Sequence, residues 1–301
     1  MKLTILGCYS ATPRIIAHTT SQVLETRGHH FLIDCGEGTQ IELRRHKLNF
    51  NQIKHIFISH LHGDHYFGLI GLISTFRLLR REVDLNIYGP KGLKEIITLQ
   101  LKLSNSWTNF NLIFHELDAK DSQCIFEDDK VEVHTIPLDH RLYTNGFLFK
   151  EKPFDRKLLI ENAESKNIDV AYYRRLKQGA DVYNQDGVLI KNKEVTTDGR
   201  IPKRYAFCSD TAYSEAIIPI IQGVDAMYHE STFLEDQAAL CAKTKHSTAI
   251  QAATIANKAR VGRLILGHYS SRYKDLEPFK NEAMTVFKQV ALAKDGKIFH
   301  I

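Results

Sequence analysis

The sequence predicts a protein of the α/β class. Strand-like apolar segments alternate with helix-like segments along the chain, and residues with metal-binding side chains follow several of the predicted strands. Apolar residues make up 43% and charged residues 25% of the 301 residues, a composition typical of a folded domain with a substantial core. The length of 301 residues allows one large α/β domain or two smaller ones.

Each predicted strand is a short apolar or alternating run that ends at a turn or at a polar side chain. The expected strands are Lys2–Leu6, Ser21–Thr26, His30–Asp34, His55–Ser59, Leu85–Tyr88, Val131–Ile136, Arg204–Cys208, Ala226–Tyr228 and Arg263–Leu266. Arg27-Gly28 is the expected turn between the second and third strands, and Gly89-Pro90 ends the fifth. Apolar residues at helical spacing predict a helix that begins at Gln40 and three more over Leu69–Leu79, Leu93–Leu103 and Thr248–Ala259.

Composition excludes several protein classes. The five cysteines form no C-x-x-C pair, which favours reduced thiols in the cytosol. The start MKLTILGCYS does not resemble a signal peptide, and the longest apolar run, around Phe67–Phe76, is too short to span a bilayer. We expect a cytoplasmic protein without a membrane partner. The net charge of +5 permits a nucleic-acid partner but does not by itself indicate one.

One short segment concentrates four potential metal ligands. The stretch SHLHGDHYFGL, residues 59–69, places His60, His62, Asp64 and His65 within six positions. Histidine is the commonest metal ligand, and a mixture of imidazole nitrogen and carboxylate oxygen suits zinc or manganese. The alternative interpretation is a chance cluster on a solvated loop. The metal interpretation therefore depends on further ligands elsewhere in the chain.

Further candidate ligands lie just after the predicted strands. These residues are His60, His140, Asp210, His229 and His268. Each histidine taken singly could be an ordinary core residue with satisfied hydrogen bonds. Ligands and reactive groups collect at the carboxyl ends of strands in α/β sheets, so five such residues favour one site gathered by the fold. The long sequence separations exclude a zinc finger, whose ligands come in close pairs.

These motifs resemble a known superfamily. H-x-H-x-D-H at 60–65, followed by His140, Asp210 and His268, is similar to the dinuclear site of the metallo-β-lactamase superfamily. Four further motifs resemble the ribonuclease Z family, which removes the 3′ trailer from precursor tRNA: DCGEGTQ at 34–40, HEST at 229–232, KHST at 245–248 and LGHYSSRY at 266–273. The resemblance runs from Leu3 to about Tyr273. It implies a single domain over residues 1–301, an αββα sandwich with the metals at one edge of two facing sheets.

The resemblance also implies a role for each site residue. His60, His62 and His140 would hold one metal, Asp64, His65 and His268 would hold the second, and Asp210 would bridge them. The implied cofactor is two Zn²⁺ per subunit, with Mn²⁺ possible. Asp64 would accept the proton of the attacking water, His246 would be the general acid, and Glu230 would orient His246. Asp34 or Glu230 could fix the ligand imidazoles. The alternative for His246 is an exposed residue before a helix capped by Ser247-Thr248.

A basic segment lies between His140 and Asp210. Residues 150–204 contain 13 Lys or Arg and 9 Asp or Glu. The resemblance implies an inserted arm that binds the tRNA body, in a homodimer whose arm presents tRNA to the partner's metals. Lysine and arginine would contact phosphates without reading sequence, and no DNA partner is expected. Tyr172 and Tyr173 could stack on RNA or form the arm's own core. The alternative is an ordinary solvated helix face.

One loop departs from the family pattern, and two rival functions stay open. After Pro13, Ala17 and His18 stand where the family has arginine and asparagine, in a loop expected to contact the start of the 3′ tail. The first rival function is that of another phosphodiesterase or hydrolase of the superfamily. The second is a non-catalytic RNA-binding relative, which the complete set of ligands disfavours.

Overall fold

The computed structural model describes residues 1–12, 14–15 and 17–301, so the Pro13 position named above lies outside the described residues. The chain divides into two compact units. Unit 1 comprises Met1–Lys150 and Lys203–Ile301, and unit 2 comprises Glu151–Pro202. No helix among the described residues is both long and apolar enough to cross a membrane.

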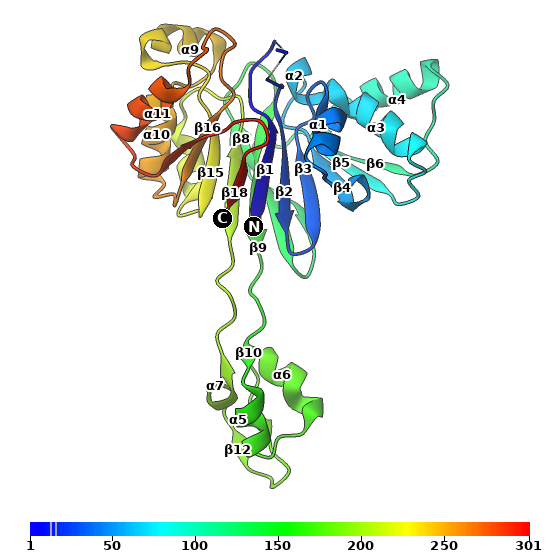
Figure 1. Ribbon diagram of the computed structural model, residues 1–301, viewed down its shortest axis with the longest axis vertical. Coiled ribbons are helices and arrows are strands. Elements are labelled where there is room, and N and C mark those ends of the chain that lie inside the picture. The colour runs from blue at the N-terminus through cyan, green and yellow to red at the C-terminus, as the bar shows by residue number, and fades with distance from the viewer. Residues whose placement is uncertain (13, 16) are drawn as a thin grey trace. The chain divides into compact units, whose positions relative to one another are not determined.

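Unit 1 is built around two seven-stranded sheets (Figure 1). The first sheet has the order β18-β1-β2-β3-β4-β5-β6, with β18 (Ile298–His300), β1 (Lys2–Gly7), β2 (Ser21–Thr26), β3 (His29–Ile33), β4 (Ile53–Phe57), β5 (Leu85–Pro90) and β6 (Leu112–Leu117). The second has the order β17-β16-β15-β14-β9-β8-β7, with β17 (Val290–Leu292), β16 (Leu264–Gly267), β15 (Ala226–Glu230), β14 (Arg204–Cys208), β9 (Thr144–Glu151), β8 (Val131–Leu138) and β7 (Cys124–Glu127).

The two sheets pack face to face through aromatic side chains. The ring of Phe57 in the first sheet lies 5.3 Å from that of Phe147 in the second, and Phe31 lies 5.4 Å from Phe149. These side chains are fully buried and belong to one core that spans both sheets. The alternation of inward and outward side chains along each strand leaves an apolar outer face that the helices cover.

Helices cover the outer face of each sheet (Figure 1). The first sheet carries α1 (Thr39–Arg45), α2 (Gly63–Tyr66), α3 (Gly68–Leu78) and α4 (Leu93–Leu103), whose apolar residues form a second core with its outer face. The second carries α8 (Ile218–Ile221), α9 (Ala238–Thr244), α10 (Ala249–Lys258) and α11 (Glu277–Met284). This is an αββα sandwich, so the fold predicted from the sequence is confirmed.

The parallel strands of both sheets point their carboxyl ends to one edge. In the first sheet β3, β4, β5 and β6 run parallel, and in the second β14, β15, β16 and β17 run parallel. The loops after these strands meet at that edge. Several predicted strand boundaries differ from the structure by one or two residues, and two of them affect residues near this edge. β4 ends at Phe57 rather than at Ser59, and β15 continues to Glu230, which places His229 inside the strand.

Unit 2 is a small unit with its own core. It contains α5 (Ile160–Ser165), α6 (Tyr173–Lys177), α7 (Asn192–Val195), the strand pair β10 (Lys157–Leu158) and β13 (Thr196–Thr197), and the hairpin β11 (Val182–Tyr183) and β12 (Leu189–Ile190). Its core consists of Ala163, Ile168, Leu176, Val182, Ile190 and Val195. Tyr173 packs against this core, whereas Tyr172 is exposed.

Unit 2 has a smaller charge excess than the segment 150–204. Residues 151–202 contain ten Lys or Arg and nine Asp or Glu. The difference arises because Lys150, Lys203 and Arg204 belong to unit 1. There, Lys150 forms a salt bridge to Glu132 at 3.0 Å and Lys203 forms one to Asp225 at 2.8 Å. Net charge alone therefore indicates little about a nucleic-acid partner of unit 2.

Candidate active site

The structure gathers the seven predicted ligand residues at the edge where the parallel strands end. His60 and His62 follow β4, and the short helix α2 carries Asp64 and His65. The other three lie on loops after β8, β14 and β16, namely His140, Asp210 and His268. Their donor atoms fall into two groups of close neighbours.

The first group consists of His60, His62, His140 and Asp210, whose donor atoms all lie within 4.8 Å of one another. His62 Nδ1 lies 2.9 Å from His60 Nε2 and 3.3 Å from His140 Nε2. Asp210 Oδ2 lies 3.4 Å from His60 Nε2. Imidazole nitrogens that converge on one point in this way match the ligand set of a zinc ion.

The second group consists of Asp64, His65 and His268. His65 Nε2 lies 3.3 Å from His268 Nε2, and each nitrogen lies within 3.5 Å of Asp64 Oδ2. Asp210 also reaches this group, because its Oδ1 lies 3.0 Å from His268 Nε2. Asp210 thus offers one carboxylate oxygen to each group.

Hydrogen bonds to the outer ring nitrogens orient the converging imidazoles. His65 Nδ1 donates to Asp34 Oδ2 at 2.7 Å, and His140 Nδ1 donates to the carbonyl of Lys245 at 2.8 Å. His268 Nδ1 lies 3.0 Å from the hydroxyl of Thr232, and His60 Nδ1 lies 3.0 Å from that of Ser59. Such partners fix the tautomer, so that Nε2 carries the lone pair that faces the centre.

The glycines of DCGEGTQ allow this loop to approach the ligand helix. A Cβ atom at Gly36 would lie 2.1 Å from Thr19 Oγ1 and 2.6 Å from the Asp64 carbonyl, and one at Gly68 would lie 2.0 Å from the Gly36 carbonyl. The amide of Cys35 donates to the carbonyl of His65 at 2.7 Å. The motif therefore holds the backbone of α2 at a fixed distance from β3.

The electrostatics of the cluster fit divalent cations. Burial lowers the pKa of His60 and His62 and lowers the pKa of His140 to about 4, so these imidazoles are neutral near pH 7, as metal ligands must be. Burial would also lower the pKa of His65, but Asp210, Asp64 and Asp34 together raise it. Buried carboxylates at this density require nearby positive charge. Two divalent cations bound by these donors would provide it.

His246 and Glu230 form a pair beside the second group. Glu230 is fully buried, and its Oε1 accepts a hydrogen bond from His246 Nδ1 at 2.8 Å. Burial opposes the charged imidazole, but Glu230 outweighs it and raises the pKa of His246 to about 9. A donor atom of His246 lies within 4.8 Å of donor atoms of Asp210 and His268. The geometry thus differs from that of an exposed helix-start residue, although Thr248 does cap α10.

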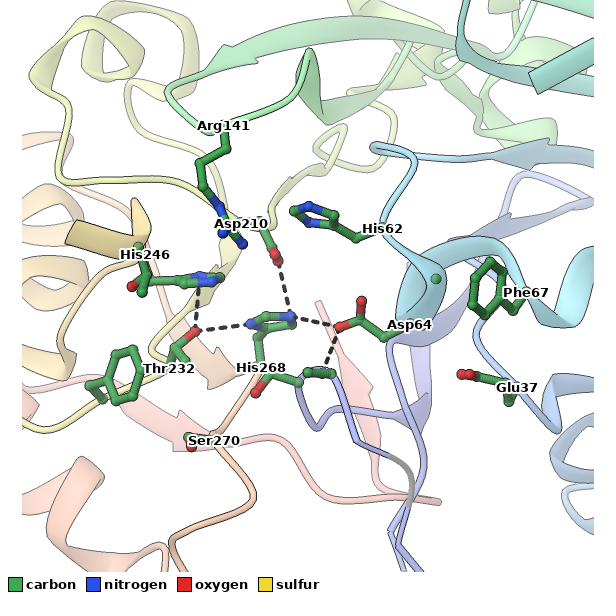
Figure 2. A pocket seen from close by; sticks show the side chains of 15 residues that line it. Glu37, His62, Asp64, Phe67, Arg141, Asp210, Thr232, His246, His268 and Ser270 are labelled. Carbon is green, nitrogen blue, oxygen red and sulfur yellow. Dashed lines mark hydrogen bonds and ion pairs between the residues drawn. The ribbon is translucent and has the colours of Figure 1, made fainter. Parts of the chain in front are cut away.

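The cluster opens into a pocket of about 450 Å³ (Figure 2). Arg141 and His246 lie on one side of it, and Phe67 and Glu37 lie on the opposite side. Four groups at this site were not predicted from the sequence. They are the side chains of Arg141 and Phe67, the Thr232 hydroxyl that joins Glu230 to His268, and the Ala11 amide that donates to Asp64 Oδ2 at 2.7 Å.

Two other predicted features lie elsewhere. His229 is buried in β15, where its Nδ1 lies 2.7 Å from the Glu230 carbonyl, and it belongs to neither ligand group. The prediction that it shares the position of the ligands was therefore wrong. His18 lies between two carboxylates, with Nδ1 2.9 Å from Asp295 and Nε2 3.2 Å from Glu42.

Comparison with known proteins identifies the family. The chain is 45% identical over 291 residues to Ribonuclease Z of Porphyromonas gingivalis strain W83, a match that covers 97% of this chain and 96% of the relative. It is 46% identical over 301 residues to Ribonuclease Z of Cytophaga hutchinsonii, covering 100% of this chain and 96% of the relative. The chain belongs to the ribonuclease Z family. Membership of the ribonuclease Z family makes it a hydrolase that acts on RNA.

Solved structures agree with this assignment. The crystal structure of human tRNase Z, short form, has a TM-score of 0.74 and 26% identity, covering 100% of this chain and 99% of the human one. The metallo-β-lactamase fold protein YhfI from Bacillus subtilis has a TM-score of 0.69 at 19% identity, covering 99% and 98% of the two chains, which shows the fold alone.

A family model described as anti-Pycsar protein Apyc1 also matches, over residues 1–172. That segment contains five of the seven predicted ligand residues but ends before Asp210 and His268. The ribonuclease Z relatives, in contrast, match nearly the whole chain and therefore cover both ligand groups.

Proposed function

We propose that this chain removes the 3′ trailer from precursor tRNA, leaving a 3′-hydroxyl on the tRNA and a 5′-phosphate on the trailer. The observation that carries the proposal is the convergence of seven ligand residues into two groups joined by Asp210, in a member of the ribonuclease Z family. The proposed cofactor is two Zn²⁺ per subunit, with Mn²⁺ as the alternative. His60, His62 and His140 would hold one ion, Asp64, His65 and His268 would hold the other, and Asp210 offers an oxygen to each group.

Two cations held by these residues would supply Lewis acidity to an in-line displacement at phosphorus and would lower the pKa of the attacking water. Asp64 orients that water and accepts its proton, while the Ala11 amide holds the Oδ2 of its carboxylate. Burial would raise the pKa of Asp64, but neighbouring imidazoles, above all His65, hold it far below its usual value, so the carboxylate is ionised and is a weak base. Proton transfer to Asp64 thus depends on the acidity of the water.

His246 acts on the leaving group. When the water oxygen bonds to phosphorus, the bond between phosphorus and the ribose 3′ oxygen breaks, and that oxygen takes a proton from His246 Nε2. Glu230 holds Nδ1 and so directs Nε2 into the pocket. Because water is the nucleophile, the 2′-hydroxyl takes no part, and no cyclic phosphate forms.

Unit 2 is the proposed arm that binds the tRNA body. Salt bridges occupy Lys166, Lys191 and Arg156, whose partners are Glu194, Asp181 and Asp198. In contrast, Arg174, Arg175 and Lys177 on α6 are exposed and form no salt bridge with a described residue. We expect these α6 cations to contact phosphates. A lysine or arginine that is already ion-paired must break that pair first, so it contributes less to the free energy of binding.

The proposed assembly is a homodimer. Exposed large apolar side chains of unit 1 concentrate in α3, α4 and the loops that follow these helices: Leu78, Leu79, Val83, Leu99, Leu103 and Trp107. Leu99 and Leu103 lie one turn apart on α4 and are 52% and 78% exposed. Apolar side chains at this density commonly mark a protein interface, and a second copy of the chain is the proposed partner.

A cleavage assay with defined end groups tests the function. Metal-loaded protein is incubated with a precursor tRNA that carries a 3′ trailer, and both products are analysed at their new ends. We expect one cut, a 3′-hydroxyl, a 5′-phosphate and close to two metal ions per chain. A 2′,3′-cyclic phosphate would refute water as the nucleophile. Cleavage of small phosphodiesters without any cut in precursor tRNA would favour another phosphodiesterase of the superfamily, and no cleavage would favour an RNA-binding relative.

A further inference from the structure

Arg141 carries a charge that the mechanism above does not use. It follows the ligand His140 in the loop between β8 and β9 and lines the pocket of the candidate active site. Among the described residues that line this pocket, Arg141 is the only lysine or arginine, whereas Glu37, Asp64 and Asp210 are carboxylates. An anionic substrate that enters the pocket therefore meets one permanently cationic side chain.

The backbone at the base of Arg141 is held in place on both sides. The amide of Ala212 donates to the Asp139 carbonyl at 2.8 Å, and His140 is bound to the Lys245 carbonyl. On the other side, the amide of Asn145 donates to the Ser59 carbonyl at 3.1 Å. Because the backbone is fixed, the Arg141 side chain can rotate to meet a ligand while the loop that carries His140 stays in place.

The guanidinium itself is available. Arg141 is exposed and makes no hydrogen bond or salt bridge with any residue that the structure describes. Its acidic neighbour Asp139 is already bound by Lys245 Nζ at 2.6 Å and so does not neutralise it. Figure 2 shows the side chain directed towards His246 and Asp210. Its charge acts on His246, whose pKa it lowers against the larger effect of Glu230.

We infer that Arg141 binds the non-bridging oxygens of the scissile phosphate through its guanidinium. This inference rests on the proposed function, because it takes a phosphodiester as the substrate. A guanidinium matches two phosphate oxygens with parallel N–H donors, and its charge is fixed at every pH that the enzyme meets. The side chain lines the same pocket as His246, the proposed donor to the leaving oxygen, and as Asp210, which joins the two ligand groups.

Only the scissile phosphate changes its charge during the reaction; the neighbouring phosphates of the RNA keep theirs. During attack, the scissile phosphate gains negative charge, so a donor aimed at it contributes more in the transition state than in the bound substrate. A donor to a neighbouring phosphate contributes equally to both states and changes binding alone. Bis(p-nitrophenyl) phosphate contains one phosphate only, so it separates these two positions.

The experiment compares Arg141→Ala and Arg141→Lys with wild-type protein on precursor tRNA and on bis(p-nitrophenyl) phosphate. Arg77→Ala is the matched control, since Arg77 is exposed on α3 and does not line the pocket. We expect Arg141→Ala to lower kcat/KM roughly 10–100-fold on both substrates, with a fall in kcat, as for loss of one charge-assisted bond. Arg141→Lys should lose less, and inorganic phosphate should inhibit Arg141→Ala more weakly than wild type.

Metal content is measured on every variant. Two ions per chain in Arg141→Ala, together with the loss on both substrates, support the inference. Unchanged hydrolysis of the small diester would overturn it, and so would loss of metal, which would give the loop a structural role. If wild-type protein hydrolyses the small diester in an Arg141-dependent manner but leaves precursor tRNA uncut, the inference stands and the proposed function fails.

Discussion

Asp34 Oδ2 accepts a hydrogen bond of 2.7 Å from His65 Nδ1, and both side chains are fully inaccessible to solvent. The same carboxylate accepts from the amide and the hydroxyl of Ser59, at 2.7 and 2.9 Å. Asp34, directly after β3, thus fixes both the ring of the candidate ligand His65 and the loop that leads to His60. Asp34 reaches this position with φ at 55°, a backbone conformation that few residues other than glycine adopt.

Asp34→Asn should weaken metal binding without removing a ligand. An amide is neutral and stabilises the neutral His65 ring less, so we expect a 10–100-fold lower affinity, roughly the effect of losing such an outer partner. Chelator competition followed by elemental analysis measures it. The control is Asp128→Asn, because Asp128 pairs with His29 at 2.8 Å outside the site. Equal affinities for Asp34→Asn and wild type would contradict the role given to Asp34.

His246→Ala should discriminate between leaving groups. The ribose 3′ oxygen needs a proton to depart, whereas p-nitrophenolate leaves readily without one. We expect cleavage of precursor tRNA to fall roughly 10²–10⁴-fold and hydrolysis of bis(p-nitrophenyl) phosphate to fall by less than about tenfold. Glu230→Gln should show the same pattern more weakly. Steady-state kinetics with both substrates decide the matter, and an equal loss on both would argue against a general acid.

Neutralising the α6 cations should affect tRNA binding rather than chemistry. In the triple variant Arg174→Gln, Arg175→Gln and Lys177→Gln, we expect KM for precursor tRNA to rise. The affinity should also depend less on salt. The slope of log affinity against log salt concentration should fall in magnitude by roughly 0.7–0.9 for each phosphate that the protein no longer neutralises. The double variant Lys166→Gln and Lys191→Gln is the control, since both lysines are ion-paired. Similar effects from both variants would indicate general charge, not a binding surface.

A charge on the exposed face of α4 should dissociate the proposed homodimer. Leu99→Asp combined with Leu103→Asp places two carboxylates where apolar contacts are expected, and sedimentation should then show monomers. Lys94→Gln with Lys102→Gln, on exposed positions of the same helix, changes the net charge by the same amount and is the control. A monomeric wild-type protein at micromolar concentration would refute the homodimer directly.

The homodimer also predicts complementation between subunits. Lys150 and Arg204 face each other in the β9–β14 register, so unit 2 can be replaced by a short turn between the two strands. Mixing such chains with His62→Ala chains should restore tRNA cleavage that neither shows alone. No restoration in mixed dimers that are shown to form would mean that each arm serves its own subunit.

His55 should make the protein less stable in mild acid. Burial lowers the pKa of His55 to about 4, from about 6.5 for a free histidine. Between these values the unfolded chain binds a proton that the folded chain does not, so this contribution to stability is complete above about pH 6.5 and is lost as the pH falls towards 4. The loss in the free energy of unfolding should be on the order of 1–3 kcal/mol. This is less than the energy equivalent of the full pKa change, because the ring of His55 is partly exposed.

Urea unfolding of wild type and His55→Phe at pH 7.5 and pH 5 measures this effect. The other histidines titrate in both proteins, so the relevant quantity is the difference between the two pH dependences. We expect the wild type to lose more stability than the variant. Parallel changes in both proteins would assign the acid sensitivity to other groups.

The seven candidate ligand residues that the structure brings together each carry a local signal in the sequence. The cluster at 60–65 is compact, and His140, Asp210 and His268 each follow an apolar run that ends abruptly. His229 follows a similar run yet lies elsewhere, because neighbouring strand residues face opposite sides of a sheet and here Glu230 faces the site. Deciding between adjacent positions needs the strand register, which a single sequence does not specify.

The sequence contains no comparable signal for backbone groups that contact the site or for charged side chains that line the pocket. The Ala11 amide and the Lys245 carbonyl hold Asp64 and His140, but any residue carries these groups. In the sequence, Arg141 resembles any other surface arginine, and only the fold places it at the pocket. The charge excess assigned to residues 150–204 was misleading for a related reason, since the pairing of β9 with β14 decides which lysines belong to unit 2.

The separation of the ligands along the chain has a consequence for how the protein matures in the cell. His60 to His65 leave the ribosome long before His268, by on the order of ten to forty seconds at ordinary synthesis rates. During that interval a metal ion can meet only part of its ligands, and without Asp210 nothing joins the two groups. An ion that bound early, as the proposed function allows, would be held by fewer donors and would exchange with the surroundings. The completed geometry, rather than the first encounter, would then decide between competing metals.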